Sequence, residues 1–453
     1  MNCRRADHLV CIGALLALSF LLVGNMPASA ASNALQEYIE NPDPAYSWVN
    51  YDRGEAEGLD IYYLQLHSQT WMGIPWCHQL TILMPKERAQ SDCALLFING
   101  GSNENGQPKW KKADKETLQF FGRMAVGCGC PAAILSQVPN QPLFDGKKED
   151  EIISFTFDKF LKTKDPNWPL LFPMVKSAVK AMDAVQAFCG DKLQWKVKKF
   201  VVSGASKRGW TTWLTGAADK RVKGIAPMVI DTLNMGPQMK HQVESFGSYS
   251  QQIEDYTKLN LPDKLGSPEG KVLTDLVDPY VYRRKLNIPK LIFMGTNDEY
   301  WPVDAIKYYF DDLQGEKYIH YVPNAGHDLG GGEQAVRALG AFFYQCARGE
   351  KHPKVTWRLS QKEDEAVLKV AADESVISAN LWTVLSSDRD FRNDKWSSLP
   401  CGEENSPKFA AEVSFPKSGY KAFYVECVFP SPLGETYSQC TRVYVANPLG
   451  VMD

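Results

Sequence analysis

The chain has 453 residues, of which 44% are hydrophobic, 11% aromatic and 23% charged, which excludes disordered, collagen-like and low-complexity classes. Its 50 Lys and Arg residues nearly balance its 53 Asp and Glu residues, and the formal net charge is -3. Since no long run of one charge occurs either, the composition argues against nucleic-acid binding as the main function and predicts no nucleic-acid partner.

A long apolar run occupies residues 9–24, with two arginines before it and a small-residue stretch ending at Ala30 after it. This order is typical of a secretory signal peptide and predicts a leader at residues 1–30 that is cleaved after Ala30. A membrane anchor is the alternative, but the run is short for a spanning helix and Pro27 follows it. We therefore expect a secreted or periplasmic protein with no membrane span in its mature form.

Nine of the 11 cysteines follow the predicted leader. Because nine is an odd number, at least one of them would be unpaired or would pair between chains in an oxidising compartment. Cys77 and Cys93 flank consecutive predicted strands and could be bridged. Two of Cys401, Cys427 and Cys440 near the C-terminus could also pair. Cysteine spacing does not fix the connectivity, so these pairings stay open.

The part of the chain before residue 353 is predicted to form a mostly parallel sheet. Alternating apolar residues at 62–85 predict an antiparallel opening, since alternation is the pattern of a half-buried strand. Short, fully apolar runs then alternate with helical stretches, which is typical of parallel strands buried on both faces. These runs lie at residues 94–98, 131–135, 200–202, 225–230, 291–294 and 318–322, and the last helices are predicted at 304–313 and 333–346.

Two further regions have a different character. Residues 232–289 are polar and rich in Gln, Tyr and Lys, and they predict a mostly helical, lid-like insertion. Beyond Pro353, alternation replaces helical periodicity, and six short strands predict a small β-sandwich at 353–453. The expected organisation is therefore an α/β domain at 31–352, with helices on both faces of its sheet, followed by an all-β domain.

The apolar strand at 200–202 runs into Gly204-Ala205-Ser206-Lys207-Arg208-Gly209, and a helix follows. A serine on such a tight strand-to-helix turn has a strained backbone and presents its hydroxyl above the sheet, as in a nucleophile elbow. The N–H of Lys207 would then face an oxyanion at the helix N-terminus. The motif departs from the usual one because its second glycine stands three residues after the serine, and a purely structural turn is the alternative.

A serine nucleophile needs a base and an orienting carboxylate, which in this class of sheet follow it in the order acid, histidine. Asp298 follows the predicted strand at 291–294, and His327 follows the strand at 318–322. We therefore predict Ser206, Asp298 and His327 as a catalytic triad. Asp231, which ends a strand, ranks second as the orienting acid. Asp304 at a helix start and Asp328 beside the histidine rank lower.

Other residues near these loops are candidates for binding. Gly100 or Gly101, after the strand at 94–98, could donate the second oxyanion N–H. Trp210 and Trp301 are candidates for substrate contact, although tryptophans behind such a turn are usually part of the core. Arg208 could recognise an acidic substrate, but a solvated or ion-paired arginine is the more ordinary interpretation.

The sequence predicts no metal site and no cofactor. It has no H-E-x-x-H motif, and Cys128-Gly129-Cys130 lacks the C-x-x-C spacing of common metal and redox sites. The glycines at 330–332 lack the lysine of a phosphate-binding loop and are interpreted as a link into the last helix.

Five stretches between residues 45 and 350 resemble those of the PhoPQ-activated pathogenicity-related protein family. They are Trp76-Cys-His-Gln-Leu-Thr-Ile, Ile98-Asn-Gly-Gly, Val202-Ser-Gly-Ala-Ser-Lys-Arg-Gly-Trp, Gly295-Thr-Asn-Asp-Glu-Tyr-Trp-Pro and Pro323-Asn-Ala-Gly-His. The resemblance implies an α/β-hydrolase-like fold, and it implies triad roles for the serine, aspartate and histidine named above. It implies no defined substrate.

The first hypothesis is therefore an exported serine hydrolase that cleaves an ester or amide through an acyl-enzyme intermediate. Its substrate would be a small molecule, a peptide or a carbohydrate ester. The alternative is a secreted signalling or binding protein, acting in virulence or growth regulation, on a hydrolase scaffold. The sequence leaves the oligomeric state open.

Overall fold

The computed structural model describes residues 28–373, 376–402 and 406–452. The predicted leader lies almost entirely outside these residues, because the described chain begins inside its last three positions, at the start of α1 (Ala28–Glu40). Within the described part of the chain, no helix is long and apolar enough to cross a membrane.

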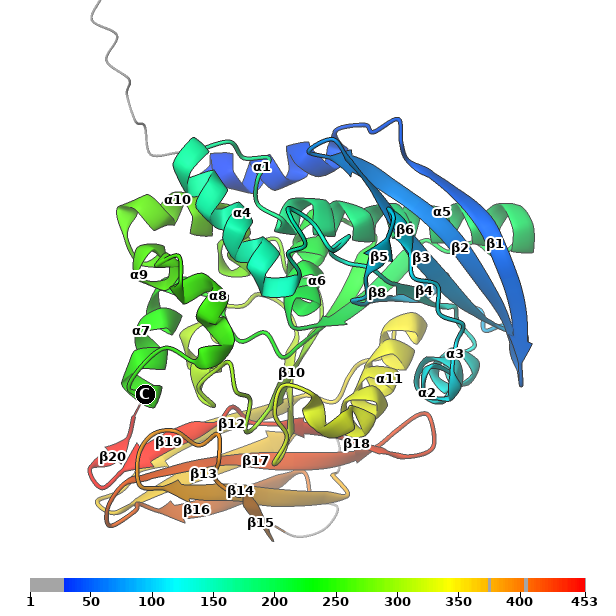
Figure 1. Ribbon diagram of the computed structural model, residues 1–453. Helices are drawn as coiled ribbons and strands as arrows, with labels where there is room; N and C mark the ends of the chain where they lie inside the picture. Colours follow the sequence, from blue (N-terminus) through cyan, green and yellow to red (C-terminus); the bar gives the residue numbers. More distant parts are fainter. Residues whose placement is uncertain (1–27, 374–375, 403–405, 453) are drawn as a thin grey trace, which may run out of the picture.

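The centre of the molecule is a nine-stranded sheet (Figure 1). Its first three strands are antiparallel and the remaining six are parallel to one another, with β7 inserted between β3 and β4. The antiparallel opening and the mostly parallel sheet predicted from the sequence are therefore confirmed. In spatial order the strands are β1 (Ser47–Ala56), β2 (Leu59–Trp71), β3 (Ile74–Pro85), β7 (Ala132–Leu135), β4 (Cys93–Ile98), β8 (Lys199–Ala205), β9 (Val222–Met228), β10 (Lys290–Gly295) and β11 (Lys317–Val322).

Helices cover both faces of this sheet, which explains why its parallel strands are predominantly apolar. Along β4, Leu95 packs into the core on one face and Leu96 into the core on the other. The first face is covered by α3 (Arg123–Cys128) and α11 (Glu333–Arg348), and the second by α5 (Leu171–Leu193) and α6 (Lys207–Ala218). This is the predicted α/β-hydrolase-like arrangement.

Residues 232–289 are helical and lie beyond the end of the sheet, beside α4 (Glu149–Thr163) (Figure 1). The Asp278 carboxylate accepts hydrogen bonds from the backbone N–H groups of Asn234, Met235 and Tyr280, at 3.2, 2.9 and 2.9 Å. One buried side chain thus ties the start of this insertion to its end. The elements are α7 (Met235–Phe246), η2 (Gln251–Ile253), α8 (Glu254–Thr257), α9 (Leu261–Leu265), α10 (Pro268–Val277) and η3 (Pro279–Tyr282).

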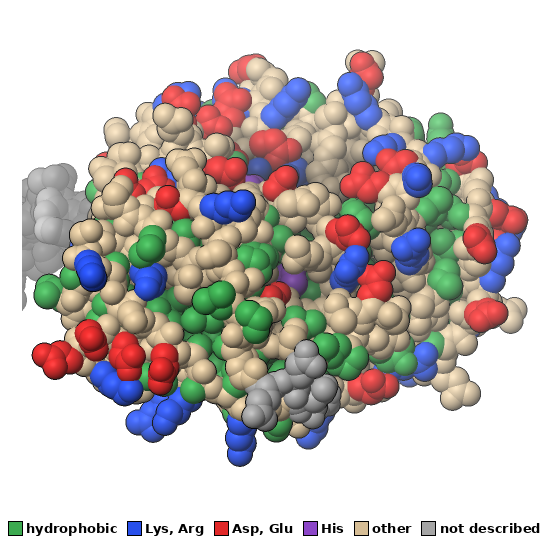
Figure 2. All heavy atoms as spheres, turned by 90° about the horizontal axis from the view of Figure 1, so that it is seen from below, with side chains coloured by type: hydrophobic (Ala, Val, Ile, Leu, Met, Phe, Trp, Pro, Cys, Tyr) green, Lys and Arg blue, Asp and Glu red, His purple; other side chains and the backbone are tan. Residues whose placement is uncertain are grey.

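The C-terminal region forms two antiparallel sheets whose apolar side chains share one core. The first has the order β12-β13-β16, and the second β15-β14-β17-β19-β20 with β18 paired to β17. Acidic and basic side chains are interspersed on the face that these sheets present (Figure 2). The strands are β12 (Val355–Gln361), β13 (Glu365–Ala372), β14 (Ser378–Ser386), β15 (Ser397–Pro400), β16 (Lys408–Ser414), β17 (Tyr420–Pro430), β18 (Thr436–Cys440), β19 (Tyr444–Asn447) and β20 (Gly450–Val451).

One predicted helix differs from the structure, the described residues beyond Pro353 form nine strands where six were predicted, and the cysteine pairings that the sequence left open do not form. The helix predicted at 304–313 is wrong, because only η4 (Ala305–Tyr308) forms there. The Lys317 ammonium donates to the carbonyls of Phe310, Asp311 and Leu313, so these groups are satisfied without a longer helix. The nine described cysteines are all free thiols, so neither Cys77 and Cys93 nor any two of the three C-terminal cysteines are paired.

The remaining elements are short. They are β5 (Asn103–Glu104), β6 (Gln107–Pro108), α2 (Lys115–Thr117), η1 (Leu118–Gly122) and η5 (Leu329–Gly331).

Candidate active site

Ser206 occupies the turn between β8 and α6 with a strained backbone. Its φ of 58° and ψ of -126° lie in a region that non-glycine residues rarely adopt. The turn is held from both sides, because the Ser206 N–H donates to the carbonyl of Met228 at 2.8 Å and the Ser206 carbonyl accepts from Trp210 N–H at 3.0 Å. This is the geometry expected of a nucleophile elbow.

The two glycines of the motif allow this turn to pack tightly. A Cβ at Gly204 would lie 2.9 Å from the Ile98 carbonyl oxygen, and a Cβ at Gly209 would lie 2.7 Å from the Met228 carbonyl oxygen. The second glycine is therefore needed where α6 crosses β9, which is three residues after the serine. Arg208, at the usual glycine position, instead extends beside Gly100.

His327 is paired with Asp298 across the loops that follow β11 and β10. The imidazole Nδ1 lies 2.9 Å from Asp298 Oδ2 and 3.1 Å from Oδ1. Burial raises the pKa of the Asp298 carboxyl, and the hydrogen bond with His327 opposes that shift. The Tyr300 N–H also donates to Asp298 at 2.8 Å, and the Tyr300 ring packs against the imidazole with centroids 4.1 Å apart and planes tilted by 31°.

The second imidazole nitrogen of His327, Nε2, is buried and has no hydrogen-bond partner among the described residues. The structure therefore contains the acid–base half of the predicted triad without a hydrogen bond from Ser206 to the imidazole. Such bonds are often long in unliganded enzymes and tighten when substrate binds.

Asp231 is not the partner of His327. Its side chain is 2% exposed, and burial, together with the carboxylates of Asp298 and Asp304, raises its pKa to about 8. Asp304 itself accepts from His241 Nε2 at 2.6 Å and pairs with Lys307 at 3.0 Å. The carboxylate paired with His327 is therefore that of Asp298 and not that of either alternative acid.

The predicted oxyanion donors lie at the same edge of the sheet. Gly100 and Gly101 follow β4, which pairs directly with β8, the strand that ends at the elbow. Lys207 is the first residue of α6, so its N–H has no acceptor within the helix. The Gly100 carbonyl is already engaged, because it accepts from Gln137 N–H at 2.8 Å.

The cationic side chains beside Ser206 are engaged in ion pairs. Lys207 Nζ lies 3.0 Å from Glu149 and 3.2 Å from Asp150, at the start of α4. Arg208 donates to Glu149 at 2.7 Å and to the Val138 carbonyl at 2.5 Å. Burial raises the pKa of Glu149, but the hydrogen bond and charge of Arg208 outweigh it and lower that pKa to about 2. Arg208 thus braces the loops around the elbow and does not line the pocket described next.

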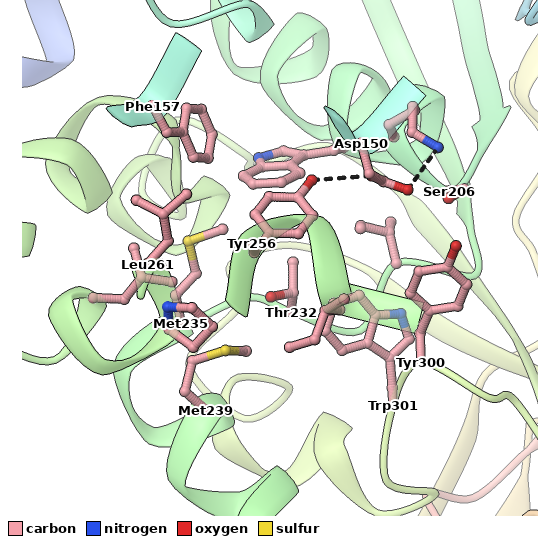
Figure 3. Close-up of a pocket in the computed structure, with 16 residues that line it drawn as sticks. Asp150, Phe157, Ser206, Thr232, Met235, Met239, Tyr256, Leu261, Tyr300 and Trp301 are labelled. Atoms are coloured by element: carbon pink, nitrogen blue, oxygen red, sulfur yellow. Dashed lines mark hydrogen bonds and ion pairs between the residues drawn. The ribbon is translucent and has the colours of Figure 1, made fainter. Parts of the chain in front are cut away.

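A pocket opens beside Ser206 and extends toward the helical insertion (Figure 3). Ser206 and Tyr300 lie at one end, and the insertion contributes most of the opposite wall. Trp210 and Trp301, both predicted to contact substrate, line it. The other lining residues are Asp150, Phe157, Ile230, Thr232, Met235, Met239, Ile253, Tyr256, Leu261, Pro262 and Leu265. The wall is therefore mostly apolar.

Sequence reasoning did not identify the acidic residues that neutralise this end of the pocket. Glu149 and Asp150 begin α4, a helix that was not predicted although its apolar positions at 152, 153, 157, 160 and 161 have helical spacing. Glu299 was also missed. Its carboxylate accepts from the His327 N–H at 2.9 Å and so fixes the loop after β11 that carries His327, here called the histidine loop.

Among the described residues, no group of three His, Cys, Asp or Glu side chains could hold a metal ion.

Comparison with known proteins gives one family match and one closely related sequence. The model of the family described as PhoPQ-activated pathogenicity-related protein matches residues 35–392. Autocrine proliferation repressor protein A of Dictyostelium discoideum is 31% identical over 448 residues, which covers 91% of this chain and 89% of that protein.

Among solved structures, two acetyl xylan esterases are similar over part of the chain. Acetyl xylan esterase 1 from Thermoanaerobacterium sp. JW/SL YS485 has 16% identity and a TM-score of 0.48, covering 70% of this chain and 93% of its own. The enzyme from Paenibacillus sp. R4 has 14% identity and a TM-score of 0.47, covering 69% and 93%.

Proposed function

The chain belongs to the PhoPQ-activated pathogenicity-related protein family, and we propose that it is an exported serine hydrolase that cleaves an ester or amide. The backbone of Ser206 carries this proposal. A serine held at a φ of 58°, on a strand-to-helix turn near a His–Asp pair, has the setting of an activated nucleophile. Strain of this kind costs about 1–3 kcal/mol and persists where the surrounding structure enforces it.

The reaction would follow the two steps of a serine hydrolase. Ser206 Oγ attacks the carbonyl carbon while His327 Nε2 takes the hydroxyl proton, and Asp298 orients the imidazole. The N–H groups of Lys207 and of Gly100 or Gly101 hold the oxyanion. The imidazolium then protonates the leaving group, and a water activated by the same imidazole hydrolyses the acyl-enzyme.

The lining of the pocket supports an uncharged, apolar acyl group. Its ionic side chains, Asp150 and Lys207, are paired with each other at 3.2 Å, so they leave no net charge for an acidic or basic substrate. Its remaining wall is built largely from Met, Leu, Ile and Trp side chains. Burying an apolar acyl chain there gains about 0.8 kcal/mol per CH₂ group.

The test compares p-nitrophenyl butyrate with p-nitrophenyl hemisuccinate and with the p-nitroanilide of butyric acid. We expect kcat/KM for the butyrate ester to exceed that for the hemisuccinate at least tenfold, because a carboxylate would lie near Asp150 in an apolar pocket. The anilide separates ester from amide cleavage. Ser206→Ala should abolish every activity while its circular dichroism spectrum stays unchanged, and an unchanged rate in that variant would overturn the proposal.

A second candidate is a secreted signalling or binding protein. Two observations favour it: Ser206 forms no hydrogen bond to His327 Nε2, and the Dictyostelium relative is named as a repressor of proliferation. If this is the function, Ser206→Ala should keep the biological response that the wild-type protein elicits. Loss of that response in Ser206→Ala would exclude it in favour of catalysis.

A further inference from the structure

We propose that the C-terminal β region positions the catalytic acid and histidine through Asn297 and Asn324. The inference rests on the proposed function and extends it, because it assigns positioning residues and a role to residues 387–396. This segment connects β14 to β15 and lies against both loops that carry the His–Asp pair.

Asn297 immediately precedes Asp298 and points its amide into this segment. Its Nδ2 group donates to the carbonyls of Asp394, Phe391 and Arg392, at 2.8, 3.0 and 3.2 Å. The Asn297 Oδ1 accepts from the Thr296 hydroxyl at 2.9 Å. The loop after β10 that carries Asp298, here called the acid loop, is thus fixed by residues 391–394, one residue before the Asp298 carboxylate.

Asn324 stands three residues before His327 and makes a two-point contact with the same segment. Its Oδ1 accepts from Trp396 N–H at 2.8 Å, and its Nδ2 donates to the Trp396 carbonyl at 3.1 Å. Its own N–H donates to Thr296 Oγ1 at 2.8 Å. Both loops therefore share Thr296 as a link and residues 391–396 as an anchor.

The anchor is rigid enough to serve this purpose. Phe391 and Trp396 are 3% and 2% exposed, and the Trp396 ring packs on Tyr424 of β17 with centroids 5.4 Å apart. Arg389 pairs with the buried Asp304 at 3.2 Å, which is also bonded to His241 of α7. Residues 387–396 thus contact the acid loop, the histidine loop and, through Asp304, the insertion that lines the pocket.

Backbone hydrogen bonds fix these loops only in part. The ladder between β10 and β11 ends at Gly295 and Val322, and beyond it the N–H groups of Thr296 and Asn297 donate to the carbonyls of Val322 and Ala325, at 3.1 and 2.9 Å. Catalytic groups need to be held within about 0.5 Å of the productive geometry, and a misplacement of 1 Å can cost about a hundredfold in rate. The two asparagines add a constraint from outside the nine-stranded sheet.

The test uses full-length Asn297→Ala and Asn324→Ala, with Asn393→Ala as the matched control. Asn393 lies in the same segment, but its side chain is exposed. With p-nitrophenyl butyrate, we expect kcat of the first two variants to fall tenfold or more while KM stays within twofold. Asn324→Asp keeps the acceptor for Trp396 N–H and should lose less activity than Asn324→Ala.

Amide hydrogen exchange provides a readout that does not depend on turnover. Exchange at residues 295–300 and 323–328 should speed up in Asn297→Ala and Asn324→Ala but not in Asn393→Ala. Kinetics and exchange indistinguishable from those of Asn393→Ala would overturn the positioning role. A wild-type protein that hydrolyses neither the ester nor the anilide would instead contradict the proposed function. In that case, faster exchange in Asn297→Ala and Asn324→Ala, but not in Asn393→Ala, would still support the anchoring of the two loops.

Discussion

Asp231 illustrates how burial decides the role of a single residue. It stands at the end of the apolar run predicted as a strand at 225–230, where a catalytic acid is expected, and for that reason it ranked second from sequence. Its side chain is 2% exposed, with Oδ1 lacking a hydrogen-bond partner, so the charged form is disfavoured. A pKa of about 8 favours its protonated form at neutral pH, and the carboxylate that contacts His327 is that of Asp298.

The raised pKa of Asp231 predicts a stability that falls as pH rises. The folded chain keeps this proton up to a pKa of about 8, whereas the unfolded chain releases it above the ordinary value of 3.8. The unfolded state therefore binds fewer protons between these values, and stability declines across that window. Asp231→Asn keeps the shape without the charge, so its Tm should exceed that of the wild type by an amount that grows to about 5 °C near pH 8.5.

The measurement is a set of thermal unfolding curves at pH 5, 7 and 8.5. Asp191→Asn, at an exposed position in α5, serves as the control and should show no such trend. A Tm difference between Asp231→Asn and the wild type that is the same at all three pH values would contradict the assignment.

At the scale of elements, the packing of α6 against β9 sets the position of Ser206. A methyl group at Gly209 would lie 2.7 Å from the Met228 carbonyl oxygen and 2.8 Å from Ile230 Cγ2. Because these neighbours belong to a central strand and to the residues that follow it, α6 must move instead. Ser206 immediately precedes that helix and would move with it.

Gly209→Ala should therefore destabilise the protein by about 2 kcal/mol and slow reaction at Ser206 at least tenfold. Gly190→Ala is the matched control, since a Cβ at this exposed helical position meets nothing within 4 Å. It should stabilise the protein by about 0.5–1 kcal/mol through helix propensity alone. Urea unfolding of both variants checks the prediction, and equal stability of the two would refute it.

Individual elements were predictable where burial imposes one simple pattern. The fully apolar strands β4, β8 and β10 are evident in the sequence because both faces of the sheet are covered. The helix expected at 304–313 stops after Tyr308, because the carbonyls of Phe310, Asp311 and Leu313 accept from the Lys317 ammonium of β11. Tertiary contacts of this kind override local propensity.

At the scale of the whole molecule, the sequence predicted which loops meet at one edge of the sheet. It did not predict the side-chain contacts between these loops and the C-terminal region. Ser206, Asp298 and His327 each follow a parallel strand, and parallel strands bring their carboxyl ends to one edge. In contrast, the contact of Asn297 with residues 391–394 joins positions almost a hundred residues apart. No local periodicity or motif encodes such a pairing.

These connections give the C-terminal sheets a proposed structural role, which is to hold the loops that carry Asp298 and His327. The sheets were predicted as a separate small domain with no assigned role, and that division stays a prediction. In the structure their β14–β15 connection reaches the loops that carry Asp298 and His327, and Leu433 from the β17–β18 connection packs beside α3 and α11. The two regions therefore meet at more than one place.

The central claim is that Ser206 is an activated nucleophile, and covalent labelling tests it most directly. The protein would be treated with a fluorophosphonate probe, and wild type, Ser206→Ala and His327→Ala would be compared by intact mass. We predict one probe per wild-type chain, none on Ser206→Ala, and labelling of His327→Ala slowed at least a hundredfold. A folded wild-type protein that stays unlabelled, or a Ser206→Ala variant that is labelled like the wild type, would contradict the claim.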